Sequence, residues 1–139
     1  MRNMIILLSF VLMVFASSAV AADIVLVVHR SNPISSLSAQ DAKMIYLGNK
    51  KSWDNGEKIT LYSQYDYAVR EDFTGKVLSK SGQQFATYWK KALFTGTGRP
   101  PIEVKDDAEM KKFIAIDPRG IGYITSTALD DSVKALPIN

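Results

Sequence analysis

Apolar and polar positions alternate along this chain in two patterns, one typical of strands and one of helices. Residues 22–30 are apolar on both faces, which predicts a strand in the interior of a sheet that helices cover on both sides. Residues 58–64 predict a second strand, residues 121–125 a short third one, and residues 132–138 a final edge strand.

Segments whose apolar residues recur at helical spacing lie between these strands. One helix is expected to begin at Ser38, with Asp41 as its capping-box partner, and to end at Gly48 in the left-handed conformation. A second follows the cap Asp66 and ends near Gly82, a third covers residues 83–94, and a fourth begins near Asp106 or Asp107. The expected buried stripes of these helices are Ala42, Ile45 and Tyr46; Val69, Phe73 and Val77; Phe85, Tyr88, Trp89, Ala92 and Leu93; and Met110, Phe113 and Ile114.

Polar turns join the elements, around Asn55-Gly56 and at residues 117–120, and residues 95–104 form an irregular connection that closes with a short extended piece. Strands that alternate with helices predict an α/β fold with a mostly parallel or mixed sheet flanked by helices.

The first residues of the chain have the pattern of an export signal. Arg2 precedes the apolar run at residues 4–16, and Ala19 and Ala21 are small residues at the −3 and −1 positions of a cleavage site. We expect residues 1–22 to be a cleaved secretory signal peptide, residues 23–139 to form a single domain, and the protein to be periplasmic with no membrane span after cleavage. The alternative is an uncleaved anchor, for which the apolar run is short.

Composition argues against several functions. The 139 residues contain no cysteine and one histidine, His29, and they lack metal-ligand spacing and the glycine motifs of phosphate loops. We therefore expect no enzyme, no catalytic residues, no metal and no cofactor. The net charge of +3 is too small to indicate nucleic-acid binding.

Polar residues that follow two strands suggest an anion site. If the first strand and the strand at 58–64 are parallel neighbours, their carboxyl ends meet at the crevice where such sheets bind ligands. The candidate ligand-binding residues are Arg30, Ser31, Asn32, Ser63, Gln64, Asp66, Tyr67 and Arg70. The alternative is that these groups only cap helices and turns.

Several segments taken together resemble the substrate-binding proteins of phosphate ABC transporters: LSAQDAKMIYLGNKKSWDNGEKITLYSQYD, REDF, FATYWKKALFTG, PP and DPRGIGYI. The resemblance spans nearly all of the chain after residue 22 and implies a periplasmic-binding-protein-like α/β fold. The chain has the length of one lobe only, whereas the family binds phosphate between two lobes. In addition, Gln64 stands in place of the family's arginine, and Tyr67 and Ala68 replace its Ser-Gly-Thr signature.

Two functions of different classes follow. The first is a short, substrate-binding-protein-like domain with weak affinity for phosphate or another oxyanion, completed by homodimerisation or by a partner. The second is a protein-interaction module in an envelope complex. For the second, the aromatics Trp53, Tyr62, Tyr65 and Tyr67 and the basic segment at 49–51 would form the contact surface, unless some of these aromatics belong to the core.

Overall fold

A computed structural model describes residues 23–139, so the predicted signal peptide at 1–22 lies outside the described residues. Helices and strands alternate along this part of the chain, as the sequence predicts. Their bounds are β1 Ile24–Val28, α1 Ala39–Tyr46, β2 Thr60–Gln64, α2 Tyr67–Phe73, the π-helical turn η1 Thr74–Leu78, α3 Gly82–Thr95, β3 Ile102–Val104, α4 Asp107–Ile116, β4 Gly120–Thr125, the 3-10 turn η2 Ser126–Ala128 and β5 Lys134–Leu136.

The strands form one mixed sheet with the order β3-β2-β4-β1-β5. β2 is parallel to β3 and β4, whereas β1 is antiparallel to both β4 and β5. The mixed sheet, the interior position of β1 and the edge position of β5 are as predicted.

The expected pairing of β1 with β2 is wrong. β4 lies between them and β1 runs in the opposite direction, so the carboxyl ends of β1 and β2 lie at opposite ends of the sheet. The physical reason is that β4, the longest strand of the sheet and buried over Gly120–Ile124, occupies the centre of the sheet, where it pairs with both strands.

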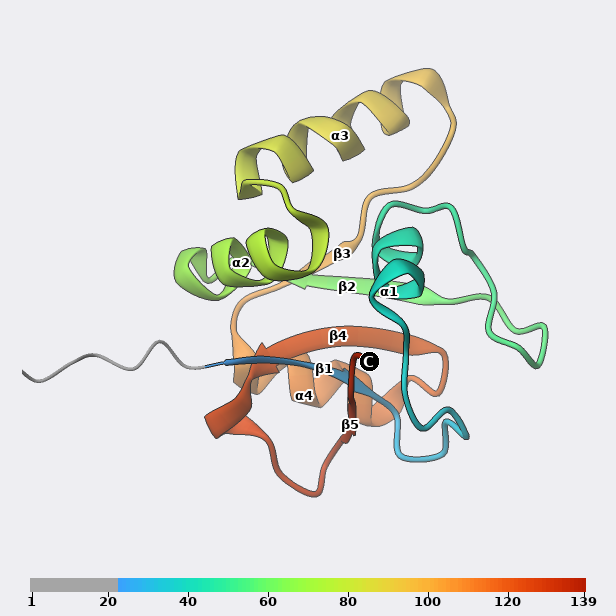
Figure 1. The fold of residues 1–139 in the computed structure, drawn as a ribbon, viewed down its shortest axis with the longest axis vertical. Coiled ribbons are helices and arrows are strands. Elements are labelled where there is room, and N and C mark those ends of the chain that lie inside the picture. The colour runs from blue at the N-terminus through green and yellow to red at the C-terminus, as the bar shows by residue number, and fades with distance from the viewer. Residues whose placement is uncertain (1–22) are drawn as a thin grey trace, which may run out of the picture.

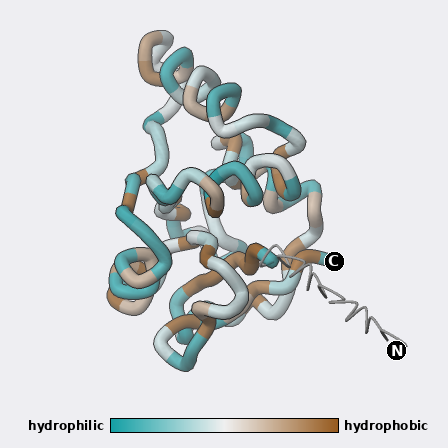
Figure 2. Tube along the Cα trace, turned by 90° about the vertical axis from the view of Figure 1, so that its left-hand side faces the viewer, coloured by the Kyte–Doolittle hydropathy of each residue, from teal (hydrophilic) through white to brown (hydrophobic). Residues whose placement is uncertain are grey.

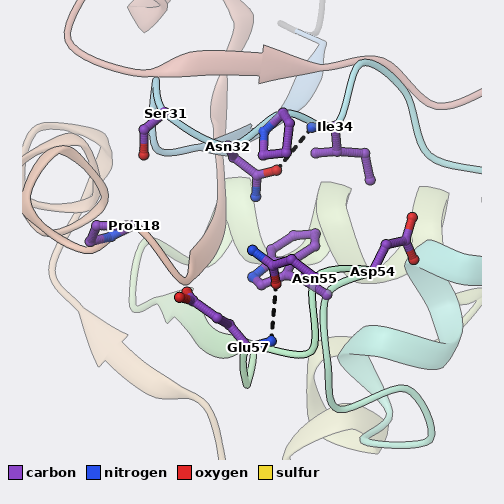
Figure 3. A pocket seen from close by; sticks show the side chains of 9 residues that line it. Ser31, Asn32, Ile34, Asp54, Asn55, Glu57 and Pro118 are labelled. Carbon is purple, nitrogen blue, oxygen red and sulfur yellow. Dashed lines mark hydrogen bonds between the residues drawn. The ribbon is translucent and has the colours of Figure 1, made fainter.

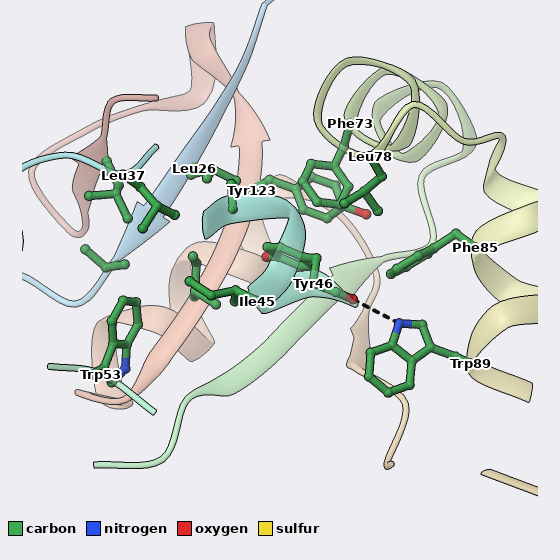
Figure 4. Close-up of a cluster of buried hydrophobic side chains, with 14 residues drawn as sticks. Leu26, Leu37, Ile45, Tyr46, Trp53, Phe73, Leu78, Phe85, Trp89 and Tyr123 are labelled. Atoms are coloured by element: carbon green, nitrogen blue, oxygen red, sulfur yellow. Dashed lines mark hydrogen bonds between the residues drawn. The ribbon is translucent and has the colours of Figure 1, made fainter. Parts of the chain in front are cut away.

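Helices cover both faces of this sheet (Figure 1). On one face α1, α2 and α3 enclose the larger core, part of which is shown in Figure 4. There the Phe73 ring stacks on Tyr123 at 3.8 Å between centroids, and the Tyr46 ring meets Phe73 edge-on at 4.6 Å. On the other face α4 packs Met110 and Ile114 against the sheet. Among the described residues, no helix is both long and apolar enough to span a bilayer.

The second predicted helix does not end at Gly82. It ends at Ser79, which adopts the left-handed conformation at φ 53°. Ser81 then caps α3: its hydroxyl accepts a hydrogen bond from the Gln84 amide at 3.1 Å, and the Gln84 side chain accepts one from the Ser81 amide at 2.9 Å. The spacing Ser81-x-x-Gln84 is that of a capping box, so Gly82 opens a helix rather than closing one.

Burial differs from the prediction at four aromatic or aliphatic side chains. Leu93 is 58 % exposed and Phe113 is 38 % exposed, because each lies at the margin of its helix's buried stripe. Trp53 and Tyr62, which the interaction hypothesis placed on the surface, are core residues. Their polar atoms are satisfied inside the protein: Trp53 Nε1 donates to the Arg119 carbonyl at 3.0 Å, and the Tyr62 hydroxyl donates to Asp117 Oδ2 at 2.8 Å.

α3 lies at one end of the molecule's long axis, and its apolar residues alternate with polar ones (Figures 1 and 2). It is attached to the end of α1 by two aromatic side chains. Trp89 Nε1 donates to the Tyr46 carbonyl at 3.2 Å, and the Tyr88 hydroxyl donates to the Leu47 carbonyl at 2.5 Å. Gly48 leaves room for the Trp89 ring, because a Cβ there would lie 2.8 Å from Trp89 Cη2.

Candidate functional site

The eight candidate residues fall into two groups at opposite ends of the sheet, because β1 and β2 run in opposite directions. Arg30, Ser31 and Asn32 follow β1 and lie at one end. The other end holds the carboxyl end of β2 and the start of α2, with Ser63, Gln64, Asp66, Tyr67 and Arg70. The sequence-based site therefore does not exist as a single constellation.

The group after β1 borders a hollow of about 420 Å³ (Figure 3). Ser31 and Asn32 line it together with the carboxylate residues Asp54 and Glu57. Like charges repel, so the two carboxylates disfavour an anion in this hollow. The side chain of Arg30 is engaged elsewhere, where it donates to the Asp131 carbonyl.

Asn32 has a structural role that the sequence did not reveal. Its Oδ1 accepts a hydrogen bond from the Ile34 amide at 3.0 Å, as in an Asx turn, and its carbonyl accepts one from Lys134 Nζ at 2.7 Å. These contacts tie the loop after β1 to β5 and account for the burial of Asn32.

The group at the carboxyl end of β2 is divided between the two faces of the sheet, because successive strand residues point to opposite sides. Gln64 is fully buried and points towards α4, where its Nε2 donates to Asp107 Oδ1 and to the Tyr123 carbonyl, both at 2.9 Å. Asp107 Oδ1 also accepts from the Thr125 amide at 3.2 Å. Gln64 and Asp107 thus tie the ends of β2 and β4 to the start of α4.

Ser63 lies on the α2 face, in contact with Tyr123 of β4. Their hydroxyl oxygens are 2.8 Å apart, and the Gln64 amide donates to the Tyr123 hydroxyl at 3.2 Å. If Tyr123 then donates its hydrogen to Ser63 Oγ, the hydroxyl hydrogen of Ser63 is left for another acceptor. Burial raises the pKa of Tyr123 to about 12, so this hydroxyl stays protonated at neutral pH.

Two charged side chains complete this cluster on the α2 face. Glu103 pairs in register with Ser63 across β2 and β3, and Arg70 of α2 is near enough to act on the pKa values of both Glu103 and Tyr123. Burial raises the pKa of the Glu103 carboxyl, and the positive charge of Arg70 lowers it in part. We call Ser63, Arg70, Glu103 and Tyr123 the β2-end cluster.

Arg70 and Glu103 carry unsatisfied polar atoms. Arg70 Nε and Glu103 Oε2 are buried, and neither has a hydrogen-bond partner within residues 23–139. The two side chains make no salt bridge with each other within 4.0 Å, although they belong to the same cluster. A buried N–H donor and a buried carboxyl oxygen without partners are costly, so a bound group that satisfies both would be stabilised here.

Asp66 and Tyr67 contribute less to this cluster. Asp66 caps α2, where its Oδ1 accepts from the Val69 amide at 3.2 Å. Tyr67 is 72 % exposed, and its neighbour Tyr65 is 65 % exposed. Sequence reasoning missed Glu103, Asp107 and Tyr123, because their positions depend on β3 and β4 flanking β2. Tyr123 was the one sequence feature that could have indicated this cluster, because it is a polar aromatic residue in an otherwise apolar strand.

No family model matches this chain, and no curated protein matches it. Several solved structures do match. A phosphate ABC transporter substrate-binding protein from Clostridium perfringens, described as putative and solved with bound phosphate, is 21 % identical with a TM-score of 0.67, over 85 % of this chain and 46 % of that one. An ABC-type phosphate transport receptor from Vibrio cholerae is 21 % identical with a TM-score of 0.58, and the match covers 84 % of this chain and 46 % of the receptor. A possible phosphate binding protein from Planctomyces limnophilus is 13 % identical with a TM-score of 0.59, and the match covers 85 % of this chain and 42 % of that protein.

The chain thus spans less than half the length of these solved structures. The match confirms the predicted fold class, an α/β lobe like those of periplasmic binding proteins, and it agrees with the resemblance found in the sequence. At these identities the likeness concerns the fold.

Proposed function

We propose that this chain is an exported, periplasmic, substrate-binding-protein-like domain that binds a small hydrogen-bearing oxyanion weakly at the β2-end cluster. The observation that carries the proposal is the pair of buried, unsatisfied atoms, Arg70 Nε and Glu103 Oε2. Phosphate is the first ligand to test, since one of the matched structures is described with phosphate bound.

Hydrogen phosphate has the chemistry that these two atoms lack. Its charged oxygens can accept from the Arg70 guanidinium and from the Ser63 hydroxyl, and its P–OH group can donate to Glu103. Sulfate has no hydrogen to donate at neutral pH. Its oxygen and the Glu103 carboxylate oxygen would both be acceptors and would repel each other. The cluster therefore favours phosphate over sulfate.

Weak affinity follows from the local charge. Arg70 supplies one positive charge, whereas Glu103 and Asp66 bring carboxylates to the same end of the sheet. We expect a millimolar dissociation constant, equivalent to about 4 kcal/mol of binding free energy.

The proposal is tested by titrating the purified protein with phosphate or sulfate at constant ionic strength while the NMR signal of the Arg70 Nε–H group is followed. We expect a saturable shift with phosphate and a smaller response with sulfate. The backbone amide signals of Ser63 and Glu103 should shift in the same titration. In Arg70→Gln, which lacks the Nε–H group, these amide shifts should be lost. Arg30→Gln is the matched control, since it removes the same charge at the opposite end of the sheet and should leave the titration unchanged.

Either of two results would reject the site: no shift at millimolar phosphate, or an equal loss in Arg30→Gln. A folded state for each variant is checked by its amide spectrum before titration.

A further inference from the structure

A second and larger hollow opens at the other end of β2. It has a volume of about 1010 Å³ and is lined by the α1–β2 connection, the start of β2 and β3, and the last turns of α3 with its return to β3. Figure 1 shows how these segments are arranged. This basic groove is separate from the β2-end cluster, since it borders the amino end of β2 at residues 58–61 and the cluster borders the carboxyl end.

The charges that line the groove are all positive. Lysine or arginine occurs at five lining positions and no aspartate or glutamate occurs at any: Lys50, Lys51, Lys58, Arg99 and Arg119. Lys50 is partly neutralised by Asp41 and Asp54, at 3.6 and 3.9 Å. The other four cations make no salt bridge with any residue in the described range 23–139.

The groove also offers apolar surface and neutral hydrogen-bonding groups. Ile102, nearly half exposed on the edge strand β3, lines it with Ile59 and Leu61. Asn49, Ser52, Thr60 and Thr97 add amide or hydroxyl groups to the lining. The walls are held together by Trp89, which packs against Gly48 and Gly98 and hydrogen-bonds to the end of α1.

We propose that the basic groove binds an acidic segment of a partner protein, in which carboxylates are interspersed with apolar side chains. The carboxylates would pair with the unneutralised lysines and arginines, and the apolar side chains would cover Ile102 and Ile59. This inference concerns a different surface from the oxyanion site and does not depend on it.

The volume and the chemistry of the lining favour a peptide over the other anionic ligands. The volume is at the upper end of the range of about 300–1,000 Å³ for sites that hold drug-sized ligands, so a single phosphate would leave most of the groove empty. An acyl chain would leave the hydroxyl and amide groups without partners, whereas a peptide backbone can hydrogen-bond to them. Charge complementarity also gives such a complex a strong dependence on salt.

The probe for this proposal is a fluorescein-labelled peptide of alternating glutamate and leucine, titrated with the purified protein, which is expressed from the full chain. We expect saturable binding by anisotropy, with amide shifts at the lining residues 49–52, 58–61 and 97–99. The double variant Lys51→Glu/Lys58→Glu should weaken binding at least tenfold. The matched control Lys43→Glu/Lys112→Glu makes the same charge change at exposed lysines outside the groove and should weaken it less than twofold.

Three outcomes would overturn the proposal. The first is no binding of the glutamate-leucine peptide, and the second is an equal loss of affinity in the two double variants. The third is displacement of the peptide by phosphatidylglycerol vesicles or by millimolar phosphate, which would identify a lipid or a small anion as the occupant. The phosphate titration of Arg70 is a separate readout, so failure of either proposal leaves the other standing.

Discussion

At the scale of single residues, Gly48 meets two demands at once. Its φ of +76° lies in the left-handed region, and the space where a Cβ would stand is taken by the Trp89 ring. Gly56 has a similar φ of +87° but no neighbouring atom within 4 Å of such a Cβ. The two glycines therefore share the backbone requirement and differ in the steric one.

We predict that Gly48→Ala lowers the free energy of unfolding by about 3 kcal/mol, the sum of left-handed strain and overpacking. Gly56→Ala should cost about 1 kcal/mol, because strain alone acts there. Urea unfolding of both variants measures the difference. Equal losses would mean that the Trp89 contact at Gly48 contributes nothing.

Residues were predicted well where a local rule applied to them. The left-handed Gly48, the cap Asp66 and the turn at Gly56 follow from spacing and residue type alone. The positions of Ser63 near the end of β2 and of Arg70 in α2 follow in the same way, whereas their role as ligands stays a prediction. Their partner Glu103 could not be found in this way, because its proximity to Ser63 depends on the pairing of β2 with β3.

At the scale of elements, α3 has a well-defined beginning. The side chains and backbone amides of Ser81 and Gln84 satisfy each other, which fixes where the helix starts after the left-handed turn at Ser79. This cap also orients α3, whose last turns form one wall of the basic groove.

Ser81→Ala should lower the free energy of unfolding by about 1 kcal/mol, because the Gln84 amide loses its acceptor. Ser35→Ala, at an exposed serine in a loop, is the control and should change stability by less than about 0.5 kcal/mol. Thermal unfolding followed by circular dichroism compares them. A loss no larger than that of Ser35→Ala would show that the capping box does not stabilise α3.

Most element positions could be predicted from the sequence because periodicity is a local property. One helix end was not: Gly82 was taken as the end of the helix after Asp66, which ends at Ser79, and Ser81 and Gln84 instead mark the start of the next helix. The exposure of Leu93 and Phe113 was also missed, because the width of a buried stripe depends on what packs against the helix.

At the scale of the whole molecule, three buried tyrosines connect β2, β4 and α1 to the core. Burial raises the pKa of Tyr46 well above its usual value and raises that of Tyr123 to about 12. The pKa of Tyr62 is also raised, first by burial and then by its hydrogen bond to Asp117. The folded state thus keeps these protons when the unfolded chain has already released them near pH 10.

The contribution of these tyrosines to stability should therefore be constant below about pH 9 and should fall as the pH rises from about 10 to about 12, since the unfolded state binds fewer protons there. The slope approaches about 1.4 kcal/mol per pH unit for each tyrosine. Urea unfolding over this range measures it. Tyr62→Phe should make the free energy of unfolding fall less steeply with pH, whereas Tyr67→Phe, at an exposed tyrosine, should leave the slope unchanged. An unchanged slope in Tyr62→Phe would show that Tyr62 does not contribute to the pH dependence.

Strand order is the property of the whole molecule that local patterns could not supply. The α/β class, the interior position of β1 and the edge position of β5 followed from hydrophobicity. The insertion of β4 between β1 and β2 did not, because several orders bury the same apolar residues equally well. That single difference divided the predicted anion site into two groups.

The two tryptophans of the chain are distributed so that each hollow has one of its own. Trp53 lines the smaller hollow beside Asn32, and Trp89 lines the basic groove. Intrinsic fluorescence therefore carries two spatially resolved signals without any added label. Spectra of Trp53→Phe and Trp89→Phe proteins would report separately on what enters each hollow.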